Sequence, residues 1–135
     1  MNQLRLPYLI TLLALFFGLT SAPIQAAPLS DADKQFLASY DKVGGALAAD
    51  DLVSAKTAAA DLREDGSELA KADSLKRART AFEKLSDKAK QLAAGRPGYY
   101  VVHCPMLKKD WVQTTEKIAN PYYGKEMLTC GEIKK

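Results

Sequence analysis

The sequence predicts a mainly α-helical domain, an antiparallel three-helix bundle followed by a C-terminal, aromatic-rich segment that contains a short antiparallel β-hairpin. Two observations predict this fold class. Residues 30–94 are rich in alanine and charge, and their apolar residues recur at helical spacing. Residues 99–135 hold five of the eight aromatic residues that follow residue 26, and they begin with a run typical of a strand.

The first 26 residues have the pattern of a secretory signal peptide. Arg5 precedes an apolar run over residues 8–19, which is too short to span a bilayer comfortably. Small residues follow the run, and cleavage is expected after Ala26; an uncleaved anchor helix is the alternative. Residues 27–135 are then a single exported domain, expected in the bacterial periplasm and without membrane contact after cleavage.

The first helix is expected to begin at a capping box, because Ser30 is followed three residues later by Asp33. Spacings of four, three and four residues then place several apolar side chains on one face of this helix. These side chains are Phe36, Tyr40, Val43 and Leu47.

Two further helices are expected before the aromatic segment. Asp50 or Asp51 can cap the second helix, which Gly66 would end. The third is expected to run from about Ser67 to Ala94, with Gly95 as its C-cap. Short connections between three amphipathic helices favour an antiparallel bundle. Charged residues of this half are interpreted as a solvated face.

The aromatic segment is expected to fold back on the helices, which are too few to bury their apolar faces alone. Tyr99–His103 has the composition of a strand, and residues 120–125 form a turn cluster. A second strand at Met127–Gly131 would then lie beside the first. Residues 111–118 are ambiguous and are expected to be extended or to form one short helix.

Composition excludes several functions. The chain has 135 residues, a formal net charge of +3 and interspersed charges of both signs, which is no nucleic-acid footprint. A single histidine excludes a multi-histidine metal site. An enzyme is disfavoured, because the adjacent His103 and Cys104 on a strand would point to opposite faces and no Cys-x-x-Cys pair is present.

The residues with soft ligand atoms gather in the aromatic segment. After residue 26, every cysteine, histidine and methionine lies between residues 103 and 130: His103, Cys104, Met106, Met127 and Cys130. Thiolate and thioether ligands select Cu(I), and imidazole also binds copper. If the two ends of this segment are adjacent, four sulfur atoms and one imidazole converge on a candidate copper(I) site.

Three motifs carry a resemblance to a known family. They are Cys104-Pro105-Met106, Asn120-Pro121-Tyr122-Tyr123-Gly124 and Met127-Leu128-Thr129-Cys130-Gly131. Together they resemble the family called domain of unknown function 3347, which occurs as small exported bacterial proteins and at the C-terminus of some periplasmic adaptors of heavy-metal efflux pumps. The resemblance implies copper or silver handling and a periplasmic efflux or metal-handling protein as partner.

Two functional hypotheses follow. In the first, Cys104 and Cys130 are thiolate ligands of Cu(I) or Ag(I), Met106 and Met127 are thioether ligands, and His103 is an optional ligand. In the second, a Cys104–Cys130 disulfide staples a structural or protein-interaction domain that binds no metal. Such a bridge closes a loop of about 27 residues and would stabilise the domain by roughly 3.5 kcal/mol. Both hypotheses require the two sulfur atoms to lie close together.

Overall fold

The computed structural model describes residues 27–135, so the expected signal peptide lies outside the described residues. The elements in chain order are α1 (Asp31–Ala48), α2 (Leu52–Ala60), α3 (Ser67–Ala70), α4 (Leu75–Ala93), β1 (Tyr100–Cys104), β2 (Lys109–Gln113), the 3₁₀-helix η1 (Gly124–Met127) and β3 (Glu132–Ile133). None of the helices in this range has the length and apolar character needed to cross a membrane.

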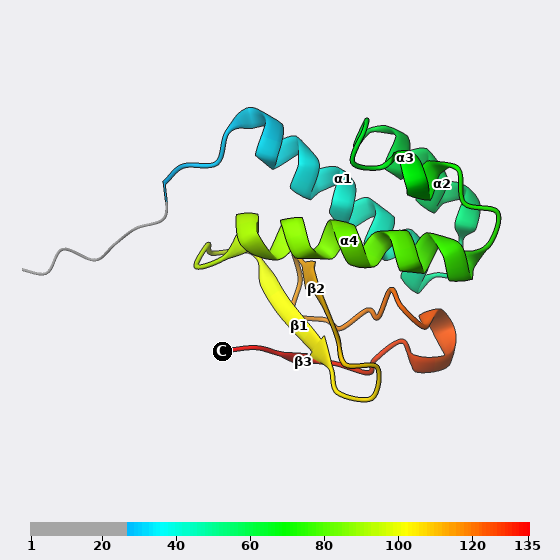
Figure 1. Cartoon of the computed structure of the whole chain (residues 1–135). Helices are drawn as coiled ribbons and strands as arrows, with labels where there is room; N and C mark the ends of the chain where they lie inside the picture. Colours follow the sequence, from blue (N-terminus) through cyan, green and yellow to red (C-terminus); the bar gives the residue numbers. More distant parts are fainter. Residues whose placement is uncertain (1–26) are drawn as a thin grey trace, which may run out of the picture.

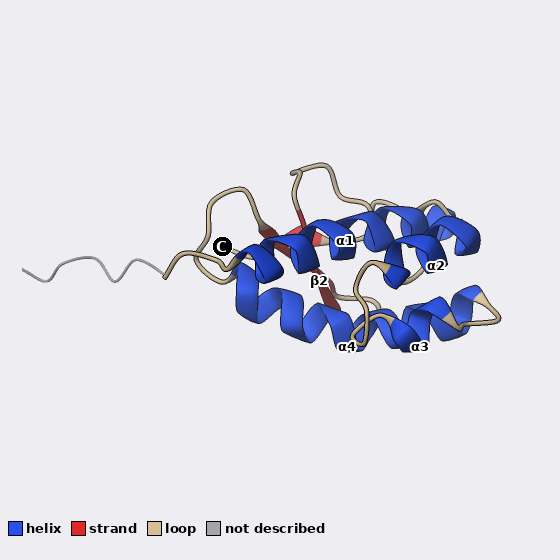
Figure 2. Cartoon of the chain, turned by 90° about the horizontal axis from the view of Figure 1, so that it is seen from above, coloured by secondary structure: helices blue, strands red, loops and turns tan. Residues whose placement is uncertain are grey.

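Helix α4 lies in the middle of the molecule (Figure 1). Helices α1, α2 and α3 lie on one side of it, and the small sheet lies on the other with η1 and the loops around it. Seen from above, α1 and α4 run side by side along the length of the domain (Figure 2). The prediction of a helical half followed by a small antiparallel sheet is therefore confirmed, but the helices do not form a simple three-helix bundle.

The predicted third helix is wrong as a single element, because it is divided in two. The chain leaves α3 after one turn and re-enters a helix at Leu75. Ser74 is the N-cap of α4, and its hydroxyl accepts from the backbone N–H of Arg77 at 3.4 Å. Serine and aspartate compete with the helix for backbone hydrogen bonds, so the Asp73-Ser74 pair starts a new helix instead of continuing the old one.

The second helix is also shorter than predicted. Asp51 is its N-cap and accepts from the backbone N–H of Ser54 at 2.9 Å, which agrees with one of the two predicted caps. The helix ends at Ala60, and the following turn residues lead to Gly66. Gly66 is packed so closely on the backbone of Ala59 that a side chain there would collide with it. Gly66 is therefore needed for the close contact with the backbone of Ala59, and it does not end α2.

The sheet has the strand order β2-β1-β3 and is antiparallel throughout. The predicted partner of the first strand is wrong: Met127 belongs to η1, and only Glu132 and Ile133 of the C-terminal run pair with β1. The true hairpin joins β1 to β2 through a four-residue turn, in which Lys108 has a φ of 53°. Local closure of a short turn costs little entropy, and it brings the Trp111 region into the extended form that was one of its two expected states.

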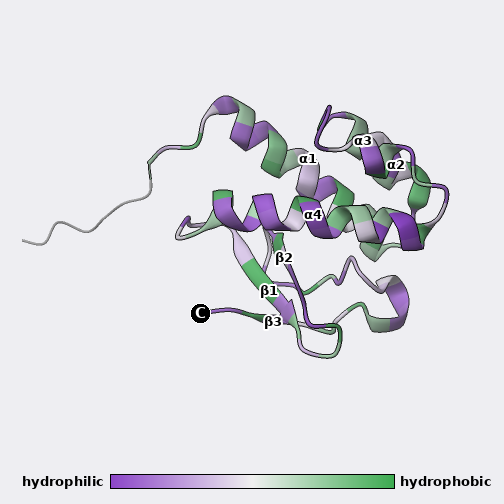
Figure 3. Cartoon of the chain, viewed as in Figure 1, coloured by the Kyte–Doolittle hydropathy of each residue, from purple (hydrophilic) through white to green (hydrophobic). Residues whose placement is uncertain are grey.

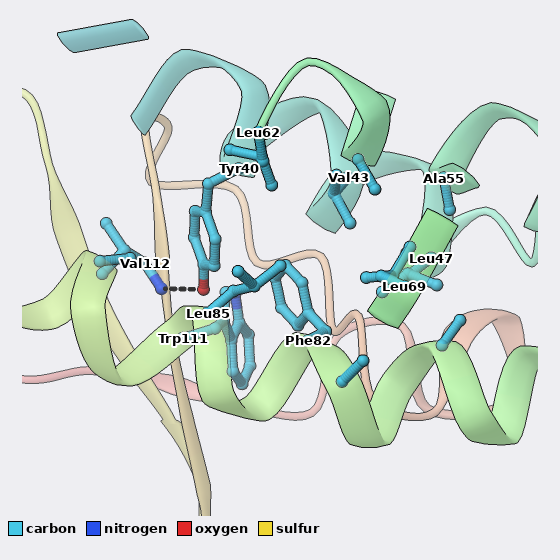
Figure 4. Close-up of a cluster of buried hydrophobic side chains, with 14 of the residues drawn as sticks. Tyr40, Val43, Leu47, Ala55, Leu62, Leu69, Phe82, Leu85, Trp111 and Val112 are labelled. Carbon is cyan, nitrogen blue, oxygen red and sulfur yellow. Dashed lines mark hydrogen bonds between the residues drawn. The ribbon is translucent and has the colours of Figure 1, made fainter. Parts of the chain in front are cut away.

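The core forms where α1, α4 and β2 meet (Figure 4). Trp111, Tyr40 and Phe82 are among its largest fully buried side chains. The rings of Tyr40 and Phe82 stack with centroids 4.7 Å apart, and Tyr122 packs edge-on against both Phe82 and Trp111. Along α4, hydrophilic and hydrophobic positions alternate as expected for a helix with one solvated face (Figure 3).

A chain of buried hydroxyl groups closes the outer edge of β2. The backbone N–H of Val112 donates to the Tyr40 hydroxyl at 3.2 Å, drawn as a dashed line in Figure 4. Ser86 Oγ lies 2.7 Å from that hydroxyl and 2.9 Å from the Tyr122 hydroxyl. The Tyr122 hydroxyl in turn donates to the backbone carbonyl of Asp110 at 2.8 Å. The strand edge thus finds hydrogen-bond partners on α1 and on the loop before η1 instead of on a further strand.

Candidate functional site

The two cysteines lie side by side between the sheet and the C-terminal loop. Cys104 is the last residue of β1 and is fully buried, whereas Cys130 lies two residues before β3 and is half-buried. Their sulfur atoms are 2.6 Å apart, and both residues are free thiols in this structure. The proximity on which both functional hypotheses depend is therefore present.

Asn120 holds the loop that carries Cys130. This side chain is fully buried, and its amide donates to the Cys130 carbonyl at 3.0 Å. Its backbone N–H donates to the Leu128 carbonyl at 2.8 Å, and its side-chain oxygen accepts from the backbone N–H of Tyr122 at 2.9 Å. A buried amide that is satisfied on both ends fixes its surroundings strongly. The Asn-Pro-Tyr-Tyr-Gly motif is thus the support of the thiol pair.

Gly131 allows the chain after Cys130 to cross the sheet. A Cβ atom at this position would lie 2.8 Å from both the Trp111 ring and the Val102 side chain, too close for either to stay in place. The glycine lets the backbone lie directly on the core, so Cys130 arrives beside the end of β1. The tryptophan therefore has a positional role next to the thiol pair.

An ion pair anchors the same loop to the helices. Arg79 Nη2 donates to Asp50 Oδ1 at 2.6 Å, and Arg79 Nε donates to the Pro121 carbonyl at 2.9 Å. Asp50 Oδ2 accepts from the backbone N–H of Lys125 at 3.0 Å. The bond from the Lys125 backbone, and then the Arg79 guanidinium, hold the pKa of Asp50 below its ordinary value. The ionised carboxylate joins the end of α1, α4 and η1.

His103 does not join the two sulfur atoms. It follows the strand alternation to the opposite face from Cys104, and its Nδ1 lies 2.6 Å from Asp110 Oδ1. Lys134 Nζ binds the other oxygen of Asp110 at 2.8 Å. Burial raises the pKa of Asp110, but the hydrogen bonds from Lys134 and His103 outweigh it and lower the pKa overall. The imidazole is thus engaged in a cross-strand pair.

The two methionines lie in different surroundings. Met106 is in the β1–β2 turn, and its side chain is 75% exposed. Met127 is in η1 and packs partly buried against the core. Across residues 27–135, no three side chains of histidine, cysteine, aspartate or glutamate lie together as a possible metal-ion site. Of the predicted five-residue set, the structure brings together the two cysteines.

The distance between the sulfur atoms decides what this pair can do without rearrangement. A disulfide bond is about 2.05 Å long, so oxidation of the two thiols, with loss of two protons and two electrons to an external oxidant, requires an approach of only roughly half an ångström. Metal–thiolate bonds are each about 2.3 Å long, as for zinc, so an ion between two thiolates requires the sulfur atoms to move apart. A hydrogen bond with Cys104, and then burial, raises the pKa of the Cys130 thiol. A raised pKa disfavours the thiolate form that a metal ion would need.

Two structural groups beside the site, the Asp50–Arg79 ion pair and the Ser86 hydroxyl, were not predicted from the sequence. The sequence pattern predicts Asp50 only as a possible cap of α2, whereas its ion-pair partner Arg79 is 29 residues away. Ser86 lies in the middle of α4, where a serine is unremarkable until Tyr40 and Tyr122 are seen to meet it. One signal was available for Asp50: Asp51 alone suffices as the cap, which leaves its neighbour without a local role.

Comparisons of this chain with protein-family models, with curated proteins and with solved structures give no match.

Proposed function

We propose that this chain is an exported interaction domain in which Cys104 and Cys130 form a disulfide staple in an oxidising compartment. The observation that carries the proposal is the 2.6 Å distance between the two sulfur atoms. Two cysteines in an exported protein most often pair with each other. The staple would join the end of β1 to the loop between η1 and β3.

The energetic argument supports the staple. The bridge closes a loop of about 27 residues, for which chain entropy gives roughly 3.5 kcal/mol of stabilisation. A domain of this size has little stability to spare, since natural domains unfold at a cost of only about 5–15 kcal/mol. The reduced and oxidised forms are therefore expected to differ clearly in melting temperature, with the oxidised form the more stable.

Thiol titration of the protein isolated from the periplasm, under denaturing conditions and without reductant, tests the proposal. We expect no free thiols in the isolated protein and two after reduction. The double variant Cys104→Ser/Cys130→Ser provides the matched control, because its melting temperature should equal that of the reduced wild type and should not respond to dithiothreitol. Two free thiols in the isolated protein would reject the staple.

A second candidate function is Cu(I) or Ag(I) binding by the reduced pair. The observation that favours it is the accessibility of the site: Cys130 is half-buried, and Met106 is exposed in the adjoining turn. Cu(I) prefers thiolates and thioethers, so the residues have the correct donor chemistry once the sulfur atoms separate. The resemblance to an efflux-associated family supports this use, with a periplasmic efflux or metal-handling protein as partner.

Cu(I) competition titrations of the reduced protein test the second candidate. Met106→Leu should keep the fold, because Met106 is exposed, and should weaken Cu(I) binding by about tenfold, equivalent to about 1.4 kcal/mol. Met127→Leu nearly conserves volume in a packed position and is the matched control. Zn(II) binding should be unchanged in both variants, since zinc does not favour thioethers. Equal Cu(I) affinities in all three proteins would remove Met106 from the ligand set.

A further inference from the structure

A groove on the far side of α4 from α1 has polar groups that the fold leaves unmatched. Its volume is about 550 Å³, and it is bounded by the N-terminal half of α4, the β1–β2 turn and η1. This volume is in the range of small-molecule sites. The groove is separate from the thiol pair, and the inference that follows does not depend on how Cys104 and Cys130 are used.

Two of the three carboxylates that line the groove already form ion pairs within the domain. Asp50 is bound to Arg79 and to the backbone of Lys125, and Glu83 is paired with Lys109. Glu126 on η1 is the third, and it has no hydrogen bond or ion pair among residues 27–135. One negative charge therefore faces the groove without a partner from the fold.

Two cationic side chains that line the groove also have N–H donors without a partner in the described part of the chain. The Arg79 guanidinium is held by three hydrogen bonds through Nε and Nη2, which leaves both N–H donors of Nη1 without a partner in the described part of the chain. Lys76 likewise has no carboxylate partner in this range. A guanidinium that is already fixed in place binds an anion at a small entropic cost.

The remaining lining is apolar and aromatic. Leu75 of α4 and Leu107 of the turn contribute aliphatic surface, and Tyr122 and Tyr123 contribute rings. Tyr123 is 43% exposed, an unusual amount for a large aromatic residue in this domain. A ligand that contacts these side chains while its charged ends meet the unmatched groups would bury apolar surface and form charge-assisted hydrogen bonds together.

We propose that this groove binds a small zwitterion, with a carboxylate at Arg79 Nη1 and Lys76, an ammonium group at Glu126, and an apolar or aromatic body against Tyr123. An apolar α-amino acid or the equivalent end groups of a short peptide have this chemistry. A doubly charged anion such as phosphate is disfavoured, because Glu126 repels it.

Calorimetric titration with three related probes tests the proposal, with the wild-type protein kept in one redox state throughout. Phenylalanine carries both charges, N-acetylphenylalanine carries only the carboxylate, and phenylalaninamide carries only the ammonium group. We expect phenylalanine to bind at least about tenfold more tightly than either of the others, because each lost charge-assisted contact is worth about that factor. Equal affinities for the three probes, or no phenylalanine binding at millimolar concentration, would overturn the proposal.

Substitutions of two exposed residues, Glu126 and Lys76, test which side chain binds the ammonium group and which binds the carboxylate. Glu126→Gln should weaken phenylalanine about tenfold and leave N-acetylphenylalanine unchanged, whereas Lys76→Gln should weaken both of these and spare phenylalaninamide. Lys84→Gln is the matched control, because Lys84 is exposed on α4, pairs with Glu68 and does not line the groove. A loss of phenylalanine binding in Lys84→Gln as large as in Lys76→Gln would place the interaction elsewhere and reject the groove. Unchanged phenylalanine binding in both groove variants would reject it too.

The tri- or tetrapeptides Gly-Gly-Phe and Phe-Gly-Gly-Phe distinguish a free amino acid from a peptide. If the two charged ends must belong to one amino acid, Gly-Gly-Phe binds more weakly than phenylalanine by about tenfold, because its ammonium group lies two residues from the aromatic side chain. If the ligand is a peptide end, one of the peptides matches or exceeds phenylalanine. Either result supports a zwitterion site, and failure of all zwitterionic probes rejects it.

Discussion

At the scale of single residues, Asp50, Arg79 and Gly124 explain how the aromatic segment is attached to the helices. Asp50 and Gly124 both have positive φ angles, 59° and 65°. Aspartate tolerates this conformation better than most residues, and glycine adopts it without cost. A Cβ atom on Gly124 would collide with the Asp50 carboxylate and the Arg79 guanidinium. The tight turn and the ion pair therefore depend on each other.

Gly124→Ala should destabilise the domain by more than a typical surface substitution, that is by more than about 1 kcal/mol, because strain at positive φ adds to the collision. Urea denaturation measures the change. Gly95→Ala is the informative control, since Gly95 also has a positive φ of 68° but faces open space. A loss in Gly124→Ala no larger than in Gly95→Ala would show that the collision with Asp50 has no energetic consequence.

The Asp50 ion pair should make the stability depend on pH. The pKa of Asp50 is lower in the folded protein than its ordinary value of 3.8, so the folded state binds fewer protons. Its contribution is fully present above the unfolded pKa and is lost as the pH falls through the lower, folded pKa. Asp50→Asn should thus destabilise the protein near pH 7 and differ progressively less from wild type below about pH 4. Thermal melts at several pH values measure this. A difference that stays constant down to pH 2 would contradict it.

At the scale of elements, the hydroxyl chain of Tyr40, Ser86 and Tyr122 joins three parts of the chain that are far apart in sequence. At the outer edge of β2, one backbone N–H donates to the Tyr40 hydroxyl of α1 and one backbone carbonyl accepts from the Tyr122 hydroxyl of the loop before η1. Ser86 of α4 lies within hydrogen-bond distance of both hydroxyls. Burial, more than any other effect, raises the pKa of Tyr40 and Tyr122, so both stay neutral. These hydrogen bonds thereby fix the position of β2 relative to α1 and α4.

Ser86→Ala should destabilise the domain by about 1–3 kcal/mol, because the two tyrosine hydroxyls lose a buried partner. Thr80→Ala on the same helix is the matched control. The Thr80 hydroxyl bonds only the carbonyl of Lys76, one turn earlier, so its loss should change stability by less than about 0.5 kcal/mol. Chemical denaturation of both variants provides the measurement. Equal effects would mean that the hydroxyl chain adds nothing to stability.

At the scale of the whole molecule, export and the oxidation state of the thiol pair belong together. Residues 1–26 lie outside the described residues, so the signal peptide stays a prediction from sequence pattern. The folded domain begins with α1 soon after the expected cleavage point. Ser30 caps that helix, and its hydroxyl accepts a hydrogen bond from the backbone N–H of Asp33 at 3.1 Å. Cleavage after Ala26 would leave this cap intact.

Intact-mass analysis of the protein from the periplasm should show a chain that begins at Ala27. The reason is the signal-peptide pattern of the first 26 residues, in which small residues at Ala26 follow the apolar run. The same spectrum before and after reduction should differ by two hydrogen atoms if the thiols are bridged. A mass that retains the apolar run of residues 8–19 would contradict export with cleavage.

The sequence by itself determined that residues 30–94 are mainly helical and where two of the helices begin, because these signals are local, but it did not show the break between α3 and α4. Ser30 and Asp51 are caps that need only the residues three positions onward, and the apolar spacing of Phe36 to Leu47 describes one helix face. The composition of residues 100–104 similarly indicated a strand. The gathering of cysteine and methionine in one segment was also visible without coordinates.

Only the tertiary structure decided how these pieces meet. Strand pairing depends on turn closure and on packing against α4. For this reason β1 pairs with β2 and not with the residues around Met127, which belong to η1. Strand alternation places His103 beside Asp110 and away from the two sulfur atoms, whereas Asn120 holds Cys130 next to Cys104. Contacts between residues tens of positions apart leave no periodic signal in one sequence, because their energy is set by three-dimensional proximity alone.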